Sequence, residues 1–435
     1  MDIPIFSRMQ RRQFLKVGAL GAGLTLSQYL RLAHAGAADT TTTRSAILVF
    51  LKGGPSHLDT FDLKPDAPAD YRGEFNPIKT NVPGVEICEH LPKLARCADQ
   101  YALVRGITHN LADHGLGSTY LLTGNRPGPL IKYPTYGSVV SRELPSPPDL
   151  PSFVSIDEPL DGPGFLGIQH SALATGEKPR ADRPFNVRGV TLGEGLSLAQ
   201  LENRQQLSRD LDTLFRGHEK LNNDVLALDE FAGKAHRILS SANTRRAFDL
   251  GAEPASSADR FGAHETGRSM LLACRLIEAG VRFVTVIVDN WDTHQQNFQT
   301  LKRTLLPQFD QGLSALFATL RERGLLASTS LMVTGEFGRT PKINGTAGRD
   351  HWPQAMFALL AGGRVRGGQV LGASDATAAE PADGGWSPDD LAASFYQNIG
   401  LNPRKEYHTS TGRPIQLIRE GRPIERLFTG AVHGG

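Results

Sequence analysis

The chain has 435 residues, with 47 Lys and Arg against 45 Asp and Glu, a formal charge of +2. A chain of this length buries a substantial core without disulfides, as one large domain or two to three smaller ones. Its three cysteines, Cys88, Cys97 and Cys274, make no disulfide framework, and both a Cys88–Cys97 pair and three ordinary thiols stay open.

The first 35 residues have the features of a twin-arginine export signal. Paired arginines at positions 11–12 precede a modest apolar stretch, and the small-residue sequence Ala-His-Ala follows at 33–35. Charged flank, apolar run and small-residue site in this order are typical of a cleaved signal, with a cytosolic N-terminal helix as the alternative. The apolar part contains Gln28 and Arg31 and is too short for a stable membrane span.

Removal of the predicted signal changes the sign of the net charge. Residues 1–35 hold five Lys or Arg and one Asp, so the remainder has 42 basic and 44 acidic side chains, a charge of −2. No basic surplus is left to indicate a nucleic-acid partner. We expect a periplasmic or secreted protein that meets the twin-arginine export machinery, with a linker at 36–43 and one α/β domain at 44–435. This export route favours a product that carries a cofactor.

The remaining chain alternates between strand-like and helix-like segments. Short apolar runs predict strands at 46–51, 101–106, 152–156, 281–288, 330–334 and 355–363. Helical spacing predicts helices near 91–97, over 265–280, over 298–323 with a possible kink at Pro307, and from 388 to about 399. Residues 198–250 form a long, charged, Leu-periodic stretch without Pro, which predicts a helical insertion. The order indicates an α/β fold, doubly wound, with a mostly parallel sheet and helices on both faces.

Polar clusters follow several of the predicted strands. In parallel sheets of this kind, ligands bind at the carboxyl ends of the strands. The candidate residues at those ends are His57 and Asp59; His109 and His114; Asp292 and His294; Glu336 and Arg339; and Arg349, Asp350 and His351.

Each cluster alone is a weak signal. A single His at a strand end is more often a hydrogen-bonded loop residue, and a buried Arg beside an acid is more often a structural ion pair. Convergence strengthens the functional interpretation, because carboxylates and imidazoles crowded at one sheet edge need a compensating cation. Mixed Asp, Glu and His ligands suit Zn, Mn or Fe. The alternative is a set of polar loops without any metal.

Longer motifs resemble a known bacterial family. The segments GGPSHLDTFDLKP, THNLADHGLGSTYLLTGNRP, EAGVRFVTVIVDNWDTH and GEFGRTPKINGTAGRDHWP are similar to those of the domain of unknown function 1501. That family is grouped with the alkaline phosphatase and sulfatase superfamily, and the resemblance covers nearly the whole chain after the signal. It implies a sulfatase-like doubly wound core, one or two divalent metals, and hydrolysis or transfer of phosphate or sulfate esters.

The resemblance also implies roles for individual residues. Asp292 and His294 resemble the Asp/His metal pair after a central strand, and Glu336 stands where the superfamily usually has an Asp-His pair. His351, with Asp350 beside it, resembles the last metal histidine. His57 and Asp59 occupy the loop where the superfamily places its first metal aspartate.

One position departs from the superfamily pattern. The nucleophile slot, nine residues before the Thr-Gly of Leu122-Thr123-Gly124, is His114 rather than Ser, Thr or Cys. His114 is then a direct nucleophile, a general base on a metal-bound water, or a metal ligand. Ser118, one helical turn further on, is a second-choice nucleophile.

These observations predict an exported, metal-dependent hydrolase of phosphate or sulfate esters. A metal-bound water or His114 attacks an anionic small-molecule or polymer ester, with His109 and Asp350 among the catalytic residues. Arg339 or Arg349 holds the anionic oxygens through its planar donor fork. The alternative is a catalytically inactive, metal-stabilised binding or scaffold protein. A transferase or isomerase like the cofactor-independent phosphoglycerate mutases is a third hypothesis.

Overall fold

An eight-stranded sheet forms the centre of the fold in a computed structural model that describes residues 43–187, 240–409 and 412–428, with isolated positions 190, 233, 237 and 238. The strand order is β12-β4-β11-β8-β1-β7-β5-β6. Only β11 runs antiparallel to its two neighbours. The strands are β1 (Ser45–Leu51), β4 (Tyr101–Ile107), β5 (Phe153–Ile156), β6 (Leu173–Ala174), β7 (Phe283–Val288), β8 (Thr329–Thr334), β11 (Met356–Ala361) and β12 (Gln369–Leu371). The predicted mostly parallel sheet is confirmed.

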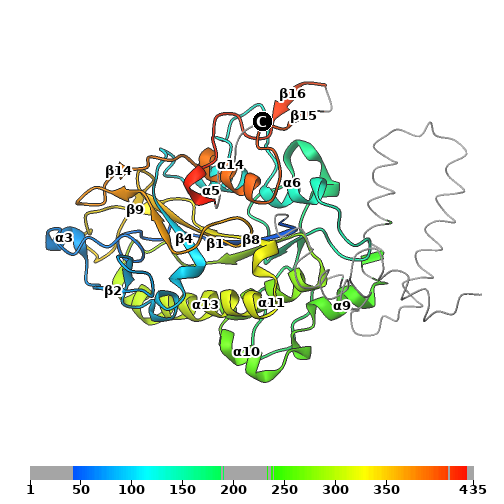
Figure 1. Ribbon diagram of the computed structural model, residues 1–435, viewed down its shortest axis with the longest axis horizontal. Coiled ribbons are helices and arrows are strands. Elements are labelled where there is room, and N and C mark those ends of the chain that lie inside the picture. The colour runs from blue at the N-terminus through cyan, green and yellow to red at the C-terminus, as the bar shows by residue number, and fades with distance from the viewer. Residues whose placement is uncertain are drawn as a thin grey trace, which may run out of the picture. The chain divides into compact units, whose positions relative to one another are not determined.

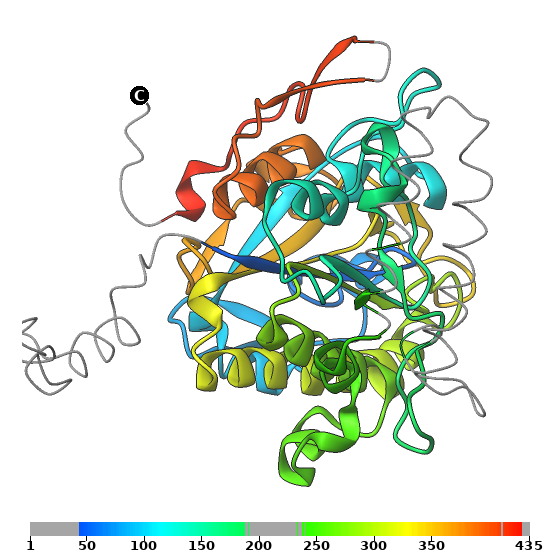
Figure 2. The ribbon, with the colours of Figure 1, turned by 90° about the vertical axis from the view of Figure 1, so that its right-hand side faces the viewer.

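Helices cover both faces of this sheet, as Figures 1 and 2 show. One layer contains α4 (Pro92–Ala95), α9 (Ala242–Phe248), α10 (Ala255–Phe261), α11 (Glu265–Ala279) and α13 (Leu306–Glu322). The other contains α5 (His114–Thr123), α6 (Tyr136–Glu143) and α14 (Pro388–Asn398). Side chains of β1 alternate between the two hydrophobic cores, with Val49 in the first and Leu48 in the second. A strand that is buried on both faces has apolar residues at successive positions in the sequence. This continuous apolar run explains why these strands could be predicted.

The start of α14 and the break near Pro307 lie close to where the sequence predicted a helix cap and a kink. Ser387 caps α14 in a capping box with Asp390, and Pro388 occupies the first turn. The stretch predicted as a kinked helix is divided into α12 (Asn297–Thr300), a π-helical turn (Leu301–Leu305) and α13. Pro307 lacks the N–H that a regular α-helix needs at this point, which accounts for the wider turn before α13.

Short elements complete the described fold. They are α3 (Ala69–Arg72) and the antiparallel pairs β2 (Pro77–Lys79) with β3 (Glu86–Cys88), β9 (Gly338–Arg339) with β10 (His351–Trp352), β13 (Ala373–Ser374) with β14 (Pro381–Asp383), and β15 (Glu406–His408) with β16 (Pro414–Gln416). The β9–β10 pair lies beyond the end of β8 and brings His351 beside Arg339 in the ladder.

Several predicted segments lie wholly or mostly outside the residues that the structure describes. The export signal and most of the linker lie outside the described residues, as does most of the helical segment 198–250, whose end forms α9. These assignments therefore stay predictions. All three cysteines are free thiols. No helix within the described residues combines the length and apolar character that a membrane span requires.

Candidate metal centre

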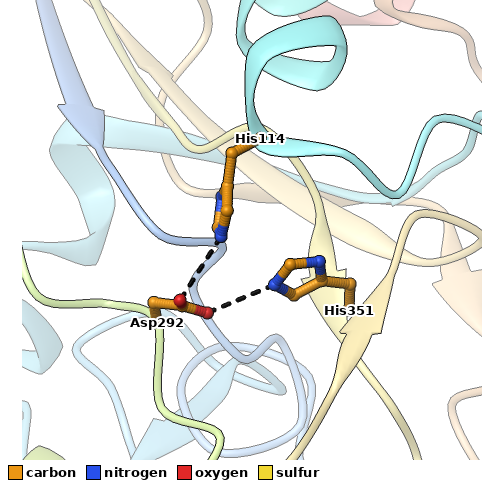
Figure 3. Close-up of side chains that lie close together, drawn as sticks. All are labelled: His114, Asp292 and His351. Atoms are coloured by element: carbon orange, nitrogen blue, oxygen red, sulfur yellow. Dashed lines mark hydrogen bonds and ion pairs between the residues drawn. The ribbon is translucent and has the colours of Figure 1, made fainter.

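Four segments from distant parts of the chain meet beyond the carboxyl ends of β7 and β8. The loop after β7 carries Asp292 and His294, the loop after β8 carries Glu336, α5 begins at His114, and β10 carries His351. Figure 3 shows His114, Asp292 and His351 pointing toward one another. Arg339 contacts Asp292 and Asp350 contacts His294, so seven of the eleven candidates converge here.

Local sequence features fix these segments. The Asp113 carboxylate accepts a hydrogen bond from the N–H of Leu116 at 2.9 Å, which starts α5 so that His114 is its first residue. Gly348 is needed where the loop before β10 crosses the loop after β7. A Cβ atom at this position would lie 1.8 Å from the carbonyl oxygen of His294, so any side chain there separates His294 from His351.

Three imidazole rings surround one carboxylate. Asp292 Oδ1 lies 3.1 Å from His294 Nε2 and 3.2 Å from His351 Nε2. The other oxygen, Oδ2, lies 3.4 Å from His114 Nε2. The Nε2 atoms of His294 and His351 are only 3.0 Å apart. We call these four residues the His-Asp cluster.

In each ring of the His-Asp cluster, Nδ1 contacts an oxygen atom outside the cluster. His114 Nδ1 lies 2.6 Å from Glu336 Oε1, His294 Nδ1 lies 2.6 Å from Asp350 Oδ1, and His351 Nδ1 lies 2.7 Å from the carbonyl oxygen of Ala112. Carboxylate and carbonyl oxygens only accept hydrogen bonds, so each Nδ1 carries the proton and donates it. A neutral ring in this tautomer directs its Nε2 lone pair into the cluster.

This donor arrangement fits a divalent cation. Two Nε2 lone pairs that face each other at 3.0 Å repel unless a proton or a metal ion lies between them. A tetrahedral Zn²⁺ with ligand bonds of about 2.0–2.1 Å has ligand-to-ligand separations of about 3.3 Å. Four of the six separations in the His-Asp cluster run from 3.0 to 3.4 Å. Among the described residues, the group whose ligand atoms all lie within 4.8 Å of one another is His114, Asp292 and His351, and His294 is not part of it.

Arg339 holds the carboxylate of the cluster in place. Its Nη2 donates to Asp292 Oδ1 at 2.5 Å. Partial burial alone would raise the pKa of Asp292, but the hydrogen bond and charge of Arg339 lower it to about 2. The remaining donors of Arg339 are directed at backbone carbonyl groups, including that of Gly54 at 2.8 Å. The guanidinium is fully buried, so it supports Asp292 rather than holding a substrate anion as the sequence suggested.

Glu336 is a fully buried carboxylate behind His114. Its Oε1 accepts from the N–H of Gly53 at 2.8 Å and from His114 Nδ1. The hydrogen bond to Glu336 outweighs partial burial and raises the pKa of His114 above its ordinary value. Glu336 Oε2 has no hydrogen-bond partner among the described residues. Glu336 therefore orients a candidate ligand from behind and offers one unpaired oxygen.

His109 lies on the far side of Glu336. Its Nδ1 accepts from the N–H of Leu111 at 3.2 Å, so Nε2 carries the proton and donates to the carbonyl oxygen of Glu336 at 2.9 Å. Burial lowers the pKa of His109 to about 4. A neutral ring with both nitrogens engaged supports the backbone at Glu336, whereas the sequence placed His109 among the catalytic residues.

His57, Asp59 and Arg349 make no contact with the His-Asp cluster, whereas the sequence grouped them with its residues. His57 is buried and its Nε2 contacts the carbonyl oxygen of Ala378 at 2.9 Å. Asp59 accepts two hydrogen bonds from Arg349, at 2.8 and 3.1 Å. Arg349 therefore neutralises Asp59 in a buried ion pair, and neither side chain reaches the cluster. Burying a charge is costly unless it is paired, which is the physical reason for this difference.

Two backbone groups that support the cluster were missed by the sequence reasoning. They are the carbonyl of Ala112, which accepts from His351, and the N–H of Gly53, which donates to Glu336. Main-chain partners leave no side-chain signal. The Gly-Gly sequence at 53–54, where both glycines have positive φ, indicated only a loop after the first strand.

The comparisons with known proteins agree with the family resemblance. The family described as "Protein of unknown function (DUF1501)" matches residues 43–428. No curated protein matches the chain.

Three of the solved structures that the chain resembles have low identity to it. They are the alkaline phosphatase from the Antarctic bacterium TAB5 (10% identity, TM-score 0.39, 83% of this chain and 99% of that chain), Ps i-CgsB in complex with k-i-k-neocarrahexaose (12%, 0.39, 83% and 73%) and the phosphonate monoester hydrolase SpPMH from Silicibacter pomeroyi (11%, 0.35, 90% and 78%). Identity and TM-score are low in each case, so the side chains of the cluster have to indicate the chemistry.

Proposed function

The chain belongs to the DUF1501 family of proteins of unknown function, and we propose that it is an exported, metal-dependent hydrolase of phosphate or sulfate esters. One observation carries the proposal: three imidazoles, each with Nδ1 engaged, direct Nε2 at the Asp292 carboxylate. His114, Asp292, His294 and His351 would hold a divalent ion such as Zn, Mn or Fe. Glu336 and Asp350, predicted as a ligand and a catalytic residue, would orient two of the rings.

A divalent cation held by these residues would supply positive charge for the ester oxygens and would lower the pKa of water bound to it. The protein contributes a fixed donor set and the N-terminus of α5, which begins at His114. The positive end of a helix dipole favours an anion beside it. Arg339 and Arg349 are engaged in the interior, so neither is proposed to receive the substrate anion.

His114 is better suited to be a ligand than a nucleophile. Its ring has the same arrangement as His294 and His351, with Nδ1 bonded to an oxygen and Nε2 facing Asp292. A covalent bond from substrate to Nε2 would remove one donor from the set. We therefore favour attack by water over a covalent phosphohistidine. Ser118, the second-choice nucleophile, is buried in α5 and, among the described residues, forms no hydrogen bond with the cluster.

The test uses the protein lacking residues 1–35. Elemental analysis as purified should give about one divalent ion per chain, and turnover of aryl phosphates or aryl sulfates should require it. His294→Ala and His351→Ala should abolish both. Absence of turnover on both panels with the metal in place contradicts the proposal.

A scaffold protein is the second candidate, because the His-Asp cluster contains no hydroxyl or thiol nucleophile. This candidate predicts that chelation lowers the melting temperature while no activity is present to be lost. Export is tested separately, by changing Arg11 and Arg12 to Lys and following the processed chain in the periplasmic fraction.

We predict that Glu336→Gln weakens metal binding without preventing folding. The amide has nearly the same shape but removes the negative charge that raises the pKa of His114. Loss of an outer partner of a metal-binding His costs roughly 10- to 100-fold in affinity. Competition with a chromogenic chelator measures the change. Glu74→Gln, at an exposed carboxylate, is the control, and equal affinities in the two variants would remove Glu336 from the site.

A further inference from the structure

The three imidazoles of the His-Asp cluster differ in how well their outer partners are buried. His114 donates to Glu336, whose side chain is fully buried, and His351 donates to a backbone carbonyl. His294 instead donates to Asp350, whose side chain is 53% exposed. An exposed pair gains little free energy from its contact, and water competes for both partners. A further contact is therefore needed to hold the His294 ring in one orientation.

The side-chain amide of Asn344 makes this further contact. Its Nδ2 donates to the carbonyl oxygen of His294 at 2.9 Å and to Asp350 Oδ1 at 3.3 Å. An amide nitrogen carries two hydrogen atoms, one for each acceptor. Asp350 Oδ1 is also the atom that accepts from His294 Nδ1. One amide group thus holds both the main chain that carries the imidazole and the carboxylate that orients it.

The oxygen of the same amide folds the loop before β10. Asn344 Oδ1 accepts from the N–H of Thr346 at 3.0 Å and from the N–H of Gly348 at 2.9 Å. Both partners are donors, whereas the partners of Nδ2 are acceptors, so the chemistry of the four partners fixes which way the amide faces. The two ends of the amide therefore make different contacts: Oδ1 holds the loop, and Nδ2 holds the His294–Asp350 pair.

Thr346 makes a second contact with the main chain of His294. Its hydroxyl oxygen lies 3.0 Å from the His294 carbonyl oxygen and 2.8 Å from Asn344 Oδ1. A hydroxyl has one proton, so it donates to one of these acceptors at a time. Among the described residues, this side chain forms no hydrogen bond with Asp350. Thr346 therefore supports the backbone at His294 but not the partner of its ring.

We propose that Asn344 is a positioning residue of the metal centre, which acts through His294 and Asp350 and does not contact the ion. The inference rests on the proposed metal centre and adds the residue that keeps its most exposed ring directed at Asp292. Its test needs the metal alone and no substrate.

The variant Asn344→Asp separates the two ends of the amide. The carboxylate keeps the oxygen that accepts from Thr346 and Gly348, but it places a second oxygen where Nδ2 faced two acceptors. Affinity for Co²⁺, measured by competition with a chromogenic chelator, should fall roughly tenfold, as for the loss of an outer partner of a metal-binding His. The added negative charge by itself would attract the cation and raise the affinity. A fall in affinity therefore reports the lost positioning.

The visible absorption spectrum at saturating Co²⁺ shows whether the bound ion has changed its surroundings. The spectrum depends on the number and geometry of the ligands, so Asn344→Asp should differ from the wild-type protein even when fully loaded. Thr346→Val should keep the wild-type spectrum, because Asn344 still holds His294 and Asp350. Asn402→Asp is the matched control: the same change at an exposed residue after α14, whose Oδ1 accepts from the N–H of Arg404. It should keep both the affinity and the spectrum.

A double variant tests whether Asn344 acts through Asp350. The losses of Co²⁺ affinity in Asn344→Asp and Asp350→Ala should not add when the two are combined, because each removes the same support of the His294 ring. Fully additive losses would overturn the inference, as would wild-type affinity and spectrum in Asn344→Asp, or equal changes in Asn344→Asp and Thr346→Val. A wild-type protein that binds no Co²⁺ overturns the metal centre and this inference together. Co²⁺ binding with these effects but without ester turnover overturns only the hydrolase.

Discussion

We expect Asp292→Asn to lose the bound metal and, with it, all measurable ester hydrolysis. Asp292 is the one residue that contacts all three imidazoles of the His-Asp cluster. Asn keeps the shape but removes the negative charge. Loss of an outer partner already costs roughly 10- to 100-fold in metal affinity, so loss of the central carboxylate should exceed 100-fold. Elemental analysis after dialysis and turnover of an aryl ester measure the two effects.

Asp289→Asn is the matched control for this variant. Asp289 lies three residues earlier in the same loop, and its Oδ1 pairs with Lys52 at 3.4 Å while Oδ2 pairs with Lys178. The substitution removes the same charge from the same loop without touching the cluster. Its metal content should match that of the wild-type protein. A chelator should lower the melting temperature of the wild-type and control proteins but not of Asp292→Asn. Stoichiometric metal in Asp292→Asn would contradict the proposed centre.

The sheet could be predicted because the feature that identifies its strands, a short run of apolar residues, is local in the sequence. A strand buried on both faces has to be apolar throughout, and the runs at β1, β7 and β8 are. Position along the chain then places Asp292, His294 and Glu336 after strand ends, where parallel neighbours bring them together. The convergence of these residues with His351 follows from pattern alone.

The partner of each charged side chain could not be predicted in the same way. Asp59 and Asp292 both follow strands and both accept from a buried arginine, yet only Asp292 faces the imidazoles. Whether an aspartate faces the imidazoles or a structural arginine depends on which loop each arginine crosses. Long-range packing determines this, and local sequence does not record it. His114 was identified as the unusual position, but its ring orientation depends on Glu336, 222 residues away.

We expect Arg349→Met to produce the largest loss of stability of any substitution outside the metal centre. Arg349 and Asp59 are both fully buried and form a two-pronged ion pair. Removal of one partner from such a pair typically costs about 3–5 kcal/mol, because the other charge stays buried without compensation. Total stabilities of folded domains are about 5–15 kcal/mol. Urea unfolding of the metal-free protein should show the loss as a lower midpoint.

The double variant Asp59→Leu with Arg349→Met identifies the cause of that loss. If the uncompensated Asp59 carboxylate destabilises the single variant, removal of both charges should restore part of the free energy of unfolding. The restoration should be incomplete, because Asp59 also accepts from Asn297 Nδ2 at 2.9 Å, in the segment that follows His294. Arg180→Met, at an exposed Arg180–Asp182 pair, should change stability by less than about 0.5 kcal/mol. A double variant less stable than Arg349→Met would show that packing around the guanidinium, rather than the charge of Asp59, holds these loops together.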